Sequence, residues 1–254
     1  MMAQGEGPGS DEFGDLRRGT LQGWSFRVAR LFFLGWLWLL TGYRVRRTAA
    51  IPPDGPLIVV SNHLHNVDPL VVAVSVPRPV HYMGKAELFR IPVLGWIIRL
   101  GGTFPIERGK ADRRALRRAE ATLAQGMGVG IFPEGTRSPT GGIQRPLAGA
   151  ALIAVRSGAP ILPVGVTGSQ YLPFNGSRVP KRRYRRSVRV VTGEAFTIPR
   201  TIDGQRVTSE MASDLMMRAV AGLLPPEYRG VYGTDQPGTK AVTAAGAEEP
   251  TSLP

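Results

Sequence analysis

Residues 57–68 read LIVVSNHLHNVD, a short apolar run that leads directly into a polar motif. Residues 129–138, VGIFPEGTRS, show the same arrangement. Buried parallel strands are typically such apolar runs, and the sites of α/β proteins gather at the carboxyl ends of their strands. If both strands run the same way in one sheet, a histidine, two acids and an arginine meet at one edge. Such a set of side chains can remove a proton from an alcohol and hold a phosphate.

Outside these two stretches, predicted strands and helices alternate along the chain. This alternation indicates an α/β fold with a mixed, largely parallel sheet flanked by helices. Asp68 and Pro69 predict a helix start, with the acid at the N-cap and the proline at the first helical position. The expected strands are 57–61, 80–83, 103–106, 128–132, 161–167 and 187–193. The expected helices are 68–76, 86–90, 93–100, 111–125, 148–157 and 206–223.

The 254 residues are expected to form one domain with appendages. Tails at 1–19 and 229–254 are predicted to be disordered, because the first is rich in glycine and acids and the second in Gly, Pro, Thr and Ala. Between the tails we expect a membrane-anchoring helix at 20–47 and an α/β domain at 48–228, which is long enough to enclose a core.

The predicted anchor is centred on residues 24–43, which read WSFRVARLFFLGWLWLLTGY and hold three of the four tryptophans. The strongly apolar part, 31–40, is short of the roughly 20 residues that a helix needs to cross a bilayer. Tryptophans at the margins and arginines at both ends suit the headgroup boundary. We therefore expect a helix that lies on a membrane or enters it shallowly, at the anionic cytoplasmic face of the cell membrane. A buried core helix is the alternative.

Composition removes several classes of chemistry. The chain has no cysteine, which excludes disulfides, thiolate metal sites and a cysteine acyl-enzyme. Its three histidines do not form an HExxH motif, so no metal site is predicted. The net charge is +13, with cationic clusters at 108–118 and 181–189. For 181–189 we favour a contact with lipid, a cofactor phosphate or a carrier protein over a solvated loop. A single interleaved Tyr184 is no stacking platform for nucleic acid.

The first motif contains the elements of a general base. A neutral histidine accepts protons near pH 7, and Asp68 lies five residues after His63, close enough across a turn to orient its ring. The sequence has no serine in a GxSxG elbow, so the substrate's own hydroxyl is the candidate nucleophile. The alternative from this spacing alone is that Asp68 only caps a helix and His63 is a hydrogen-bonded turn residue.

The second motif adds an acid, a flexible glycine and a cation suited to phosphate in Glu134-Gly135-Thr136-Arg137. Arg108 follows a third predicted strand, and Lys85 follows the strand at 80–83. One such cation is usually a solvated surface charge. Cations behind several strands at one sheet edge favour an anion-binding site.

These motifs resemble those of the glycerophosphate/lysophosphatidate acyltransferase family, among whose members the chain is most similar to the 1-acyl-sn-glycerol-3-phosphate acyltransferases. The resemblance covers about residues 44–200 and rests on four blocks that occur in the family's order. The blocks are Asn62-His63-x4-Asp68, Gly101-Gly102-Thr103-Phe104-Pro105-Ile106-Glu107-Arg108, Phe132-Pro133-Glu134-Gly135-Thr136-Arg137-Ser138 and Ala159-Pro160-Ile161-Leu162-Pro163-Val164.

The resemblance implies direct acyl transfer from acyl-CoA or acyl carrier protein to the sn-2 hydroxyl of lysophosphatidic acid, which forms phosphatidic acid for phospholipid biosynthesis. No cofactor is implied besides this co-substrate, and membrane lipids are the implied surroundings. His63 would take the hydroxyl proton, and Asp68 would hold His63. The remaining roles follow the family: phosphate binding by Lys85, Arg108 and Arg137, positioning of the glycerol by Glu134 and Gly135 beside Thr136, and shaping of the acyl side by Pro160 and Pro163.

The chain departs from the family pattern at two places. His65 stands where the family usually has serine, and it could take over the hydroxyl's hydrogen bond, point to solvent or compete as the base. Residues 147–150 read LAGA, where the family often has a lysine near a Gly-Ala pair. These departures keep two further functions open: acylation of another lysophospholipid or alcohol, and a non-catalytic peripheral protein that binds anionic lipid.

Overall fold

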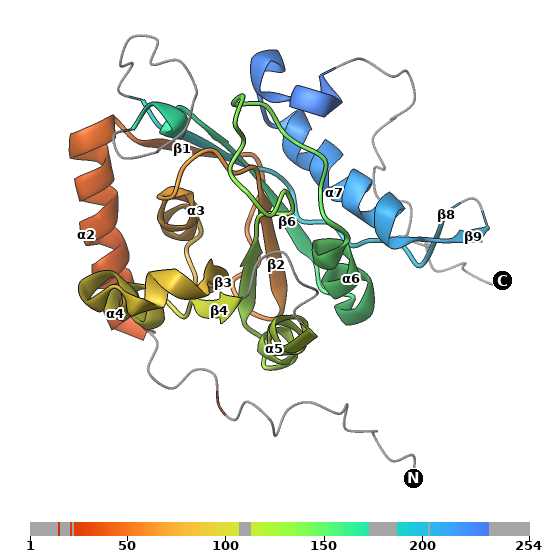
Figure 1. The fold of residues 1–254 in the computed structure, drawn as a ribbon, viewed down its shortest axis with the longest axis horizontal. Helices are drawn as coiled ribbons and strands as arrows, with labels where there is room; N and C mark the ends of the chain where they lie inside the picture. Colours follow the sequence, from red (N-terminus) through yellow and green to blue (C-terminus); the bar gives the residue numbers. More distant parts are fainter. Residues whose placement is uncertain are drawn as a thin grey trace, which may run out of the picture.

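The computed structural model describes residues 15, 21, 23–106, 113–172, 187–202 and 204–233 (Figure 1). The strands in these ranges are β1 (Arg44–Arg47), β2 (Leu57–Ser61), β3 (Val80–Lys85), β4 (Phe104–Ile106), β5 (Gly128–Ile131), β6 (Ile161–Thr167), β7 (Arg189–Thr192), β8 (Thr201–Ile202) and β9 (Gln205–Arg206). The α-helices are α2 (Gly23–Thr41), α3 (Asp68–Ser75), α4 (Pro92–Leu100), α5 (Arg113–Ala124), α6 (Ala148–Ser157) and α7 (Ser209–Gly222). The 3-10 helices are η1 (Ala86–Arg90), η2 (Ser169–Tyr171), η3 (Pro226–Tyr228) and η4 (Gly230–Tyr232).

The central sheet has the strand order β1-β7-β6-β2-β5-β3-β4. Strands β6, β2, β5, β3 and β4 are parallel to one another, while β7 pairs antiparallel with β6 and parallel with β1. The predicted mixed, largely parallel sheet is therefore confirmed. A separate hairpin of β8 and β9 lies outside it.

The sheet is covered on both faces, and β2 shows why. Ile58 and Val60 belong to the core cluster shared with α5, α6 and α7, whereas Leu57 and Val59 belong to the cluster shared with α2 and α3. Each of these four side chains is buried. A strand that is buried on both faces has no polar side to show, which explains the uninterrupted apolar run in the sequence. Figure 1 shows α2 and α3 on one side of the sheet and α6 and α7 on the other.

The register of β2 and β5 brings the two polar motifs to the same edge. Leu57 pairs with Gly128, and Val60 pairs with Ile131, so the two strands end at the same level. A close approach across the sheet also explains one glycine, since a Cβ on Gly130 would run into the ring of Tyr82 on β3.

Two predicted boundaries need correction. The helix predicted over 20–47 ends at Thr41, and Arg44–Arg47 form β1, an edge strand whose four charged or β-branched residues give no alternating apolar signal. The tail predicted from 229 is ordered at least to Gly233, because Val231 donates its N–H to the Ile143 carbonyl at 3.1 Å. The helix predicted over 86–90 has the expected bounds and is a 3-10 helix. The remainder of the two predicted tails, residues 1–19 and 234–254, lies outside the described residues, except for residue 15.

Candidate active site

The first polar loop leaves β2 and holds an imidazole against a carboxylate. The Nδ1 atom of His63 lies 3.0 Å from the Oδ2 atom of Asp68. Because a carboxylate only accepts hydrogen bonds, this contact places the proton on Nδ1 and leaves the Nε2 lone pair as a base. His63 is only 4% exposed, so its environment is set by the protein more than by water.

Asp68 does more than orient the ring, and it does not cap the helix as predicted. It is the first residue of α3, and the N-cap position belongs to Val67. Its Oδ2 atom accepts the backbone N–H groups of Leu64 and His65, each at 2.6 Å, in addition to the His63 ring. The carboxylate thus closes the loop on itself. Its other oxygen, Oδ1, is buried and has no hydrogen-bond partner among the described residues.

His65, the residue that departs from the family's serine, has a structural place in this loop. It is buried, and its Nδ1 atom accepts the backbone N–H of Val67 at 3.0 Å. A serine hydroxyl makes the same kind of bond to a backbone N–H two residues ahead. The structure therefore supports replacement of the serine's hydrogen bond and contradicts a solvent-facing side chain.

The loop is also tied to the next strand. The Nδ2 atom of Asn62 donates to the Val166 carbonyl at 2.9 Å, and its Oδ1 atom accepts the Val166 N–H at 2.8 Å. The Asn62 side chain thus extends the hydrogen bonding between β2 and β6 beyond the end of β2. It fixes the position from which His63 projects.

The second loop, after β5, reaches across to the first through Glu134. Its Oε1 atom accepts the N–H of His63 at 2.9 Å, and its Oε2 atom accepts the N–H of Gln144 at 2.9 Å. The N–H of Ser138 also donates to the His63 carbonyl at 2.7 Å. Burial raises the pKa of Glu134 to about 7, although both backbone donors act in the opposite direction.

This placement gives Glu134 a structural role that the sequence did not predict. The family resemblance implies that Glu134 positions the glycerol. In the structure the carboxylate is buried, and each of its oxygens accepts a backbone N–H. The backbone contact made by Gln144 carries no side-chain signature, so the sequence could not reveal this partner.

An aromatic ring forms one wall of the site. Phe132 stacks on the His63 ring with centroids 4.3 Å apart and planes 27° from parallel, and its other neighbour is the Tyr82 ring at 6.0 Å. Phe132 belongs to the second motif, but the sequence alone indicates no function for it. Its apolar face limits water around the imidazole and fixes the tilt of the ring.

The predicted cationic residues are placed unevenly. Lys85 is the last residue of β3, is exposed, and lies 3.3 Å from Glu87 through its Nζ atom. Arg137 is half-buried and Thr136 is exposed, both on the second loop beside Gly135, whose φ of +67° favours glycine. Arg108 and most of the cluster at 181–189 lie outside the described residues.

The two prolines predicted to shape the acyl side lie at different levels of β6. Pro163 is buried within the strand and pairs with Val60, three residues before His63. Pro160 precedes the strand, and its carbonyl accepts the N–H of Ile58. Pro160 is therefore at the amino end of the strands, the edge opposite His63, and its part in shaping the acyl side stays a prediction.

Comparison with known proteins agrees with this geometry. A family model described as Acyltransferase matches residues 42–167, which begin just after α2 and include both polar loops. A 1-acyl-sn-glycerol-3-phosphate acyltransferase from Bacillus subtilis is 30% identical over 143 residues, or 56% of this chain and 68% of that protein. This chain belongs to the glycerophosphate/lysophosphatidate acyltransferase family.

Two further relatives of the family extend the match. A 1-acyl-sn-glycerol-3-phosphate acyltransferase from Chlamydomonas reinhardtii is 31% identical over 183 residues, which are 70% of this chain and 52% of that protein. The chain thus spans about half the length of this relative. The crystal structure of the 1-acyl-sn-glycerophosphate acyltransferase PlsC from Thermotoga maritima superposes with a TM-score of 0.56 at 27% identity, covering 78% of this chain and 80% of that one.

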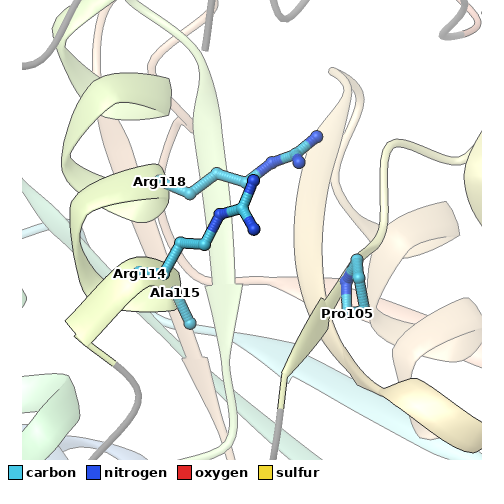
Figure 2. Close-up of a pocket in the computed structure, with 4 residues that line it drawn as sticks. All are labelled: Pro105, Arg114, Ala115 and Arg118. Atoms are coloured by element: carbon cyan, nitrogen blue, oxygen red, sulfur yellow. The ribbon is translucent and has the colours of Figure 1, made fainter. Parts of the chain in front are cut away.

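A hollow of about 170 Å³ lies away from the family's His-x4-Asp motif, between β4 and α5 (Figure 2). It is lined by Pro105, Arg114, Ala115 and Arg118, and Figure 2 shows both arginine side chains directed into the same space. Burial lowers the pKa of Arg118, and the neighbouring Arg114 charge adds to this effect. In the sheet, β4 is three strands from β2, so this hollow is distinct from the space around His63.

Proposed function

We propose that this protein is a 1-acyl-sn-glycerol-3-phosphate O-acyltransferase. It transfers an acyl chain from acyl-CoA or acyl carrier protein to the sn-2 hydroxyl of lysophosphatidic acid and forms phosphatidic acid. The observation that carries this proposal is the buried His63–Asp68 pair, held at the edge where β2 and β5 end. The names of the relatives, each a 1-acyl-sn-glycerol-3-phosphate or 1-acyl-sn-glycerophosphate acyltransferase, support the choice of acceptor.

The chemical step follows from the geometry of His63. Its Nε2 atom takes the proton from the acceptor hydroxyl as the oxygen attacks the thioester carbonyl, and the imidazolium then returns the proton to the departing thiolate. The C–O bond forms and the C–S bond breaks, with no covalent enzyme intermediate. The Asp68 carboxylate accepts the hydrogen bond from Nδ1 and thereby stabilises the imidazolium. A positioned base contributes about 10²- to 10⁴-fold to the rate.

The neighbouring residues divide into two groups in this mechanism. Glu134 is a positioning residue, because its oxygens hold the backbone of His63 and of Gln144. Lys85 and Arg137 are the cations assigned to the acceptor phosphate, since Lys85 ends β3 and Arg137 lies in the loop that follows β5. Arg108 shares this assignment on sequence grounds. Holding two bound reactants in place can itself remove about 7 kcal/mol or more of the barrier.

The proposal includes membrane association through α2. This helix packs Phe33 and Leu34 on the core and leaves Trp24, Leu31 and Phe32 exposed, so it is apolar on both sides. An exposed apolar face of this size on a helix is typical of an interfacial membrane helix. Among the described helices, none combines the length and hydropathy needed to cross a bilayer. We infer a position on the cytoplasmic face, where anionic lipids attract the flanking arginines.

An acyl-transfer assay with a panel of acceptors tests the function. Labelled acyl-CoA and acyl carrier protein are offered with lysophosphatidic acid, with lysophospholipids that carry larger headgroups, and with monoacylglycerol, which lacks the phosphate. We expect turnover with lysophosphatidic acid, and His63→Ala should retain less than about a tenth of it. Turnover only without a phosphate would overturn the roles of Arg137 and Lys85. No turnover with any acceptor would favour a lipid-binding protein.

A further inference from the structure

We propose that η1 and α4 form a second lipid-contacting face, which continues the outward face of α2 and sets the carboxyl end of β3 at the headgroup layer of an anionic bilayer. This inference rests on the proposed function, because a lysolipid acceptor must be drawn from a membrane. It assigns the membrane contact to a segment far from the N-terminal helix in sequence.

The first observation is a set of exposed apolar side chains on two short adjoining helices. Leu88 on η1, Ile91 in the junction, and Trp96 and Ile97 on α4 are all exposed, Trp96 to 62%. A single exposed apolar residue is ordinary on a protein surface, but four within ten positions of the chain mark an interaction surface.

The two short helices are held together as one unit, which leaves these side chains outward. The guanidinium group of Arg99 donates to the Phe89 carbonyl at 3.1 Å and lies 5.3 Å over the centre of the Phe89 ring. The N–H of Gly95 also donates to the Ile91 carbonyl at 2.6 Å. These contacts fix η1 and α4 relative to each other, and the four exposed side chains project from this unit.

The third observation is continuity with α2. The N–H of Leu21, two residues before α2, donates to the carbonyl of Leu100, the last residue of α4, at 3.0 Å. Trp24, in the first turn of α2, is 78% exposed. Figure 1 shows α4 beside this end of α2. The two apolar faces thus meet at one corner of the molecule.

The charges around these apolar side chains favour an anionic lipid surface as the binding partner. Arg27 on α2, Arg90 on η1 and Arg99 on α4 are exposed beside the apolar side chains. In these three elements the only acid is Glu87, which lies 3.3 Å from Lys85. Apolar and tryptophan side chains bordered by arginines match the acyl and anionic headgroup layers of a bilayer.

The surface is connected directly to the candidate active site. Lys85 ends β3, and η1 begins at the next residue. The Phe89 ring packs on this strand end so closely that a Cβ on Gly84 would lie 3.3 Å from its Cε2 atom. A lysolipid whose chain stays in the bilayer would then meet Lys85 with its phosphate at the edge where Glu134 and His63 lie.

A double variant, Trp96→Asp with Ile97→Asp, tests the proposal by binding to vesicles of phosphatidylcholine and phosphatidylglycerol. We expect partitioning to be about tenfold weaker, since the variant lacks two apolar side chains that would move from water into the bilayer. Activity on acceptor in vesicles should fall in proportion, while activity on detergent-dispersed acceptor should stay. Val231→Asp is the matched control, because Val231 is 53% exposed on η4 beside Ile143 rather than beside α2. Wild-type partitioning of the double variant, or equal loss in the control, would overturn the proposal.

A spectroscopic test does not depend on a destabilising change. The chain has four tryptophans, so replacing Trp24, Trp36 and Trp38 by Phe leaves Trp96 as the only one. Vesicles should shift its emission to shorter wavelength, and brominated acyl chains should quench it. Unchanged emission while the protein pellets with vesicles would refute contact at α4. These readouts decide the inference even if the acyl-transfer assay fails, so the two failures are distinguishable.

Discussion

The loops that follow β2 and β5 reach the same sheet edge and are built in opposite ways. The first is closed on itself, because Asp68 accepts from the ring of His63 and from the N–H groups of Leu64 and His65. The acid of the second loop contacts the first loop instead, because Glu134 accepts the backbone N–H of His63 as well as that of Gln144. In the proposed mechanism, the first loop fixes the tautomer of the base, and the second loop fixes where the base stands.

This difference separates chemistry from placement. A change that breaks the first loop should alter the imidazole itself, whereas a change in the second should leave the imidazole intact but displaced. Both changes should lower kcat, and the loss should be larger for the first loop. Loss of a contact with the acceptor should instead raise KM.

Asp68→Asn should cause the largest effect, because a neutral amide stabilises an imidazolium poorly and does not dictate which ring nitrogen carries the proton. We expect kcat to fall by about 10²- to 10⁴-fold at saturating acceptor and donor. Tyr43→Phe is the control: its hydroxyl lies 2.6 Å from the Ser75 hydroxyl in a buried pair away from His63. A near wild-type kcat for Asp68→Asn, or the same loss in the control, would contradict the first loop's role.

Glu134→Gln should produce the next largest effect. The amide nitrogen cannot accept a hydrogen bond, so either the His63 or the Gln144 N–H loses its partner. We expect kcat to fall by about 10²-fold through misplacement of the base, with little change in the KM for acceptor. A large rise in that KM with kcat preserved would instead favour the substrate contact that the family resemblance implies.

The same variant should change how stability depends on pH. Burial raises the pKa of Glu134 from 4.5 to about 7, so in this interval the folded protein holds more protons than the unfolded chain. The free energy of unfolding from this group is therefore highest at low pH and falls as the pH rises through about 7. Urea unfolding at pH 5 and pH 8 should show this fall reduced in Glu134→Gln. An equal change in the free energy of unfolding between pH 5 and pH 8 in both proteins would exclude the raised pKa.

Most of the sheet was predictable from sequence because its strands are buried on both faces. The runs that contain β2, β5 and β6 are continuous and apolar, and their predicted ranges agree with the structure to within a residue. The edge strand β1, Arg44–Arg47, was missed, because a charged strand on a sheet edge has no apolar run. The two-residue strands β8 and β9 are too short to give a periodic signal.

The candidate site was predictable in its chemistry and only partly in its geometry. The His63–Asp68 contact follows from spacing within one loop, where a turn brings both side chains together. The direction of Glu134 depends on burial and on a backbone N–H at Gln144, and neither has a signature in the residues themselves. The same holds for Phe132, whose stacking on His63 requires the register of β2 and β5.

Arg137→Ala should have a smaller and different effect from the changes at either acid. If the half-buried guanidinium binds the acceptor phosphate, its loss should raise the KM for lysophosphatidic acid by about tenfold and leave kcat nearly unchanged. Arg206→Ala is the matched control, an exposed arginine on the separate β8–β9 hairpin. An unchanged KM in Arg137→Ala, measured over a range of acceptor concentrations, would contradict the assignment.

Phe132→Leu should have the smallest effect. It sharpens the comparison because Phe132 is the first residue of the second loop, while its ring packs on the imidazole of the first loop. Leucine keeps the apolar contact but loses the flat face, so we expect kcat to fall by about two- to tenfold. Phe104→Leu is the control. Phe104 is fully buried in the core cluster shared with α5, α6 and α7, whereas Phe132 packs against the cluster shared with α2 and α3. The control should lower the free energy of unfolding more than Phe132→Leu and leave the kcat of the folded enzyme unchanged. The reverse pattern would mean that Phe132 serves the core rather than the base.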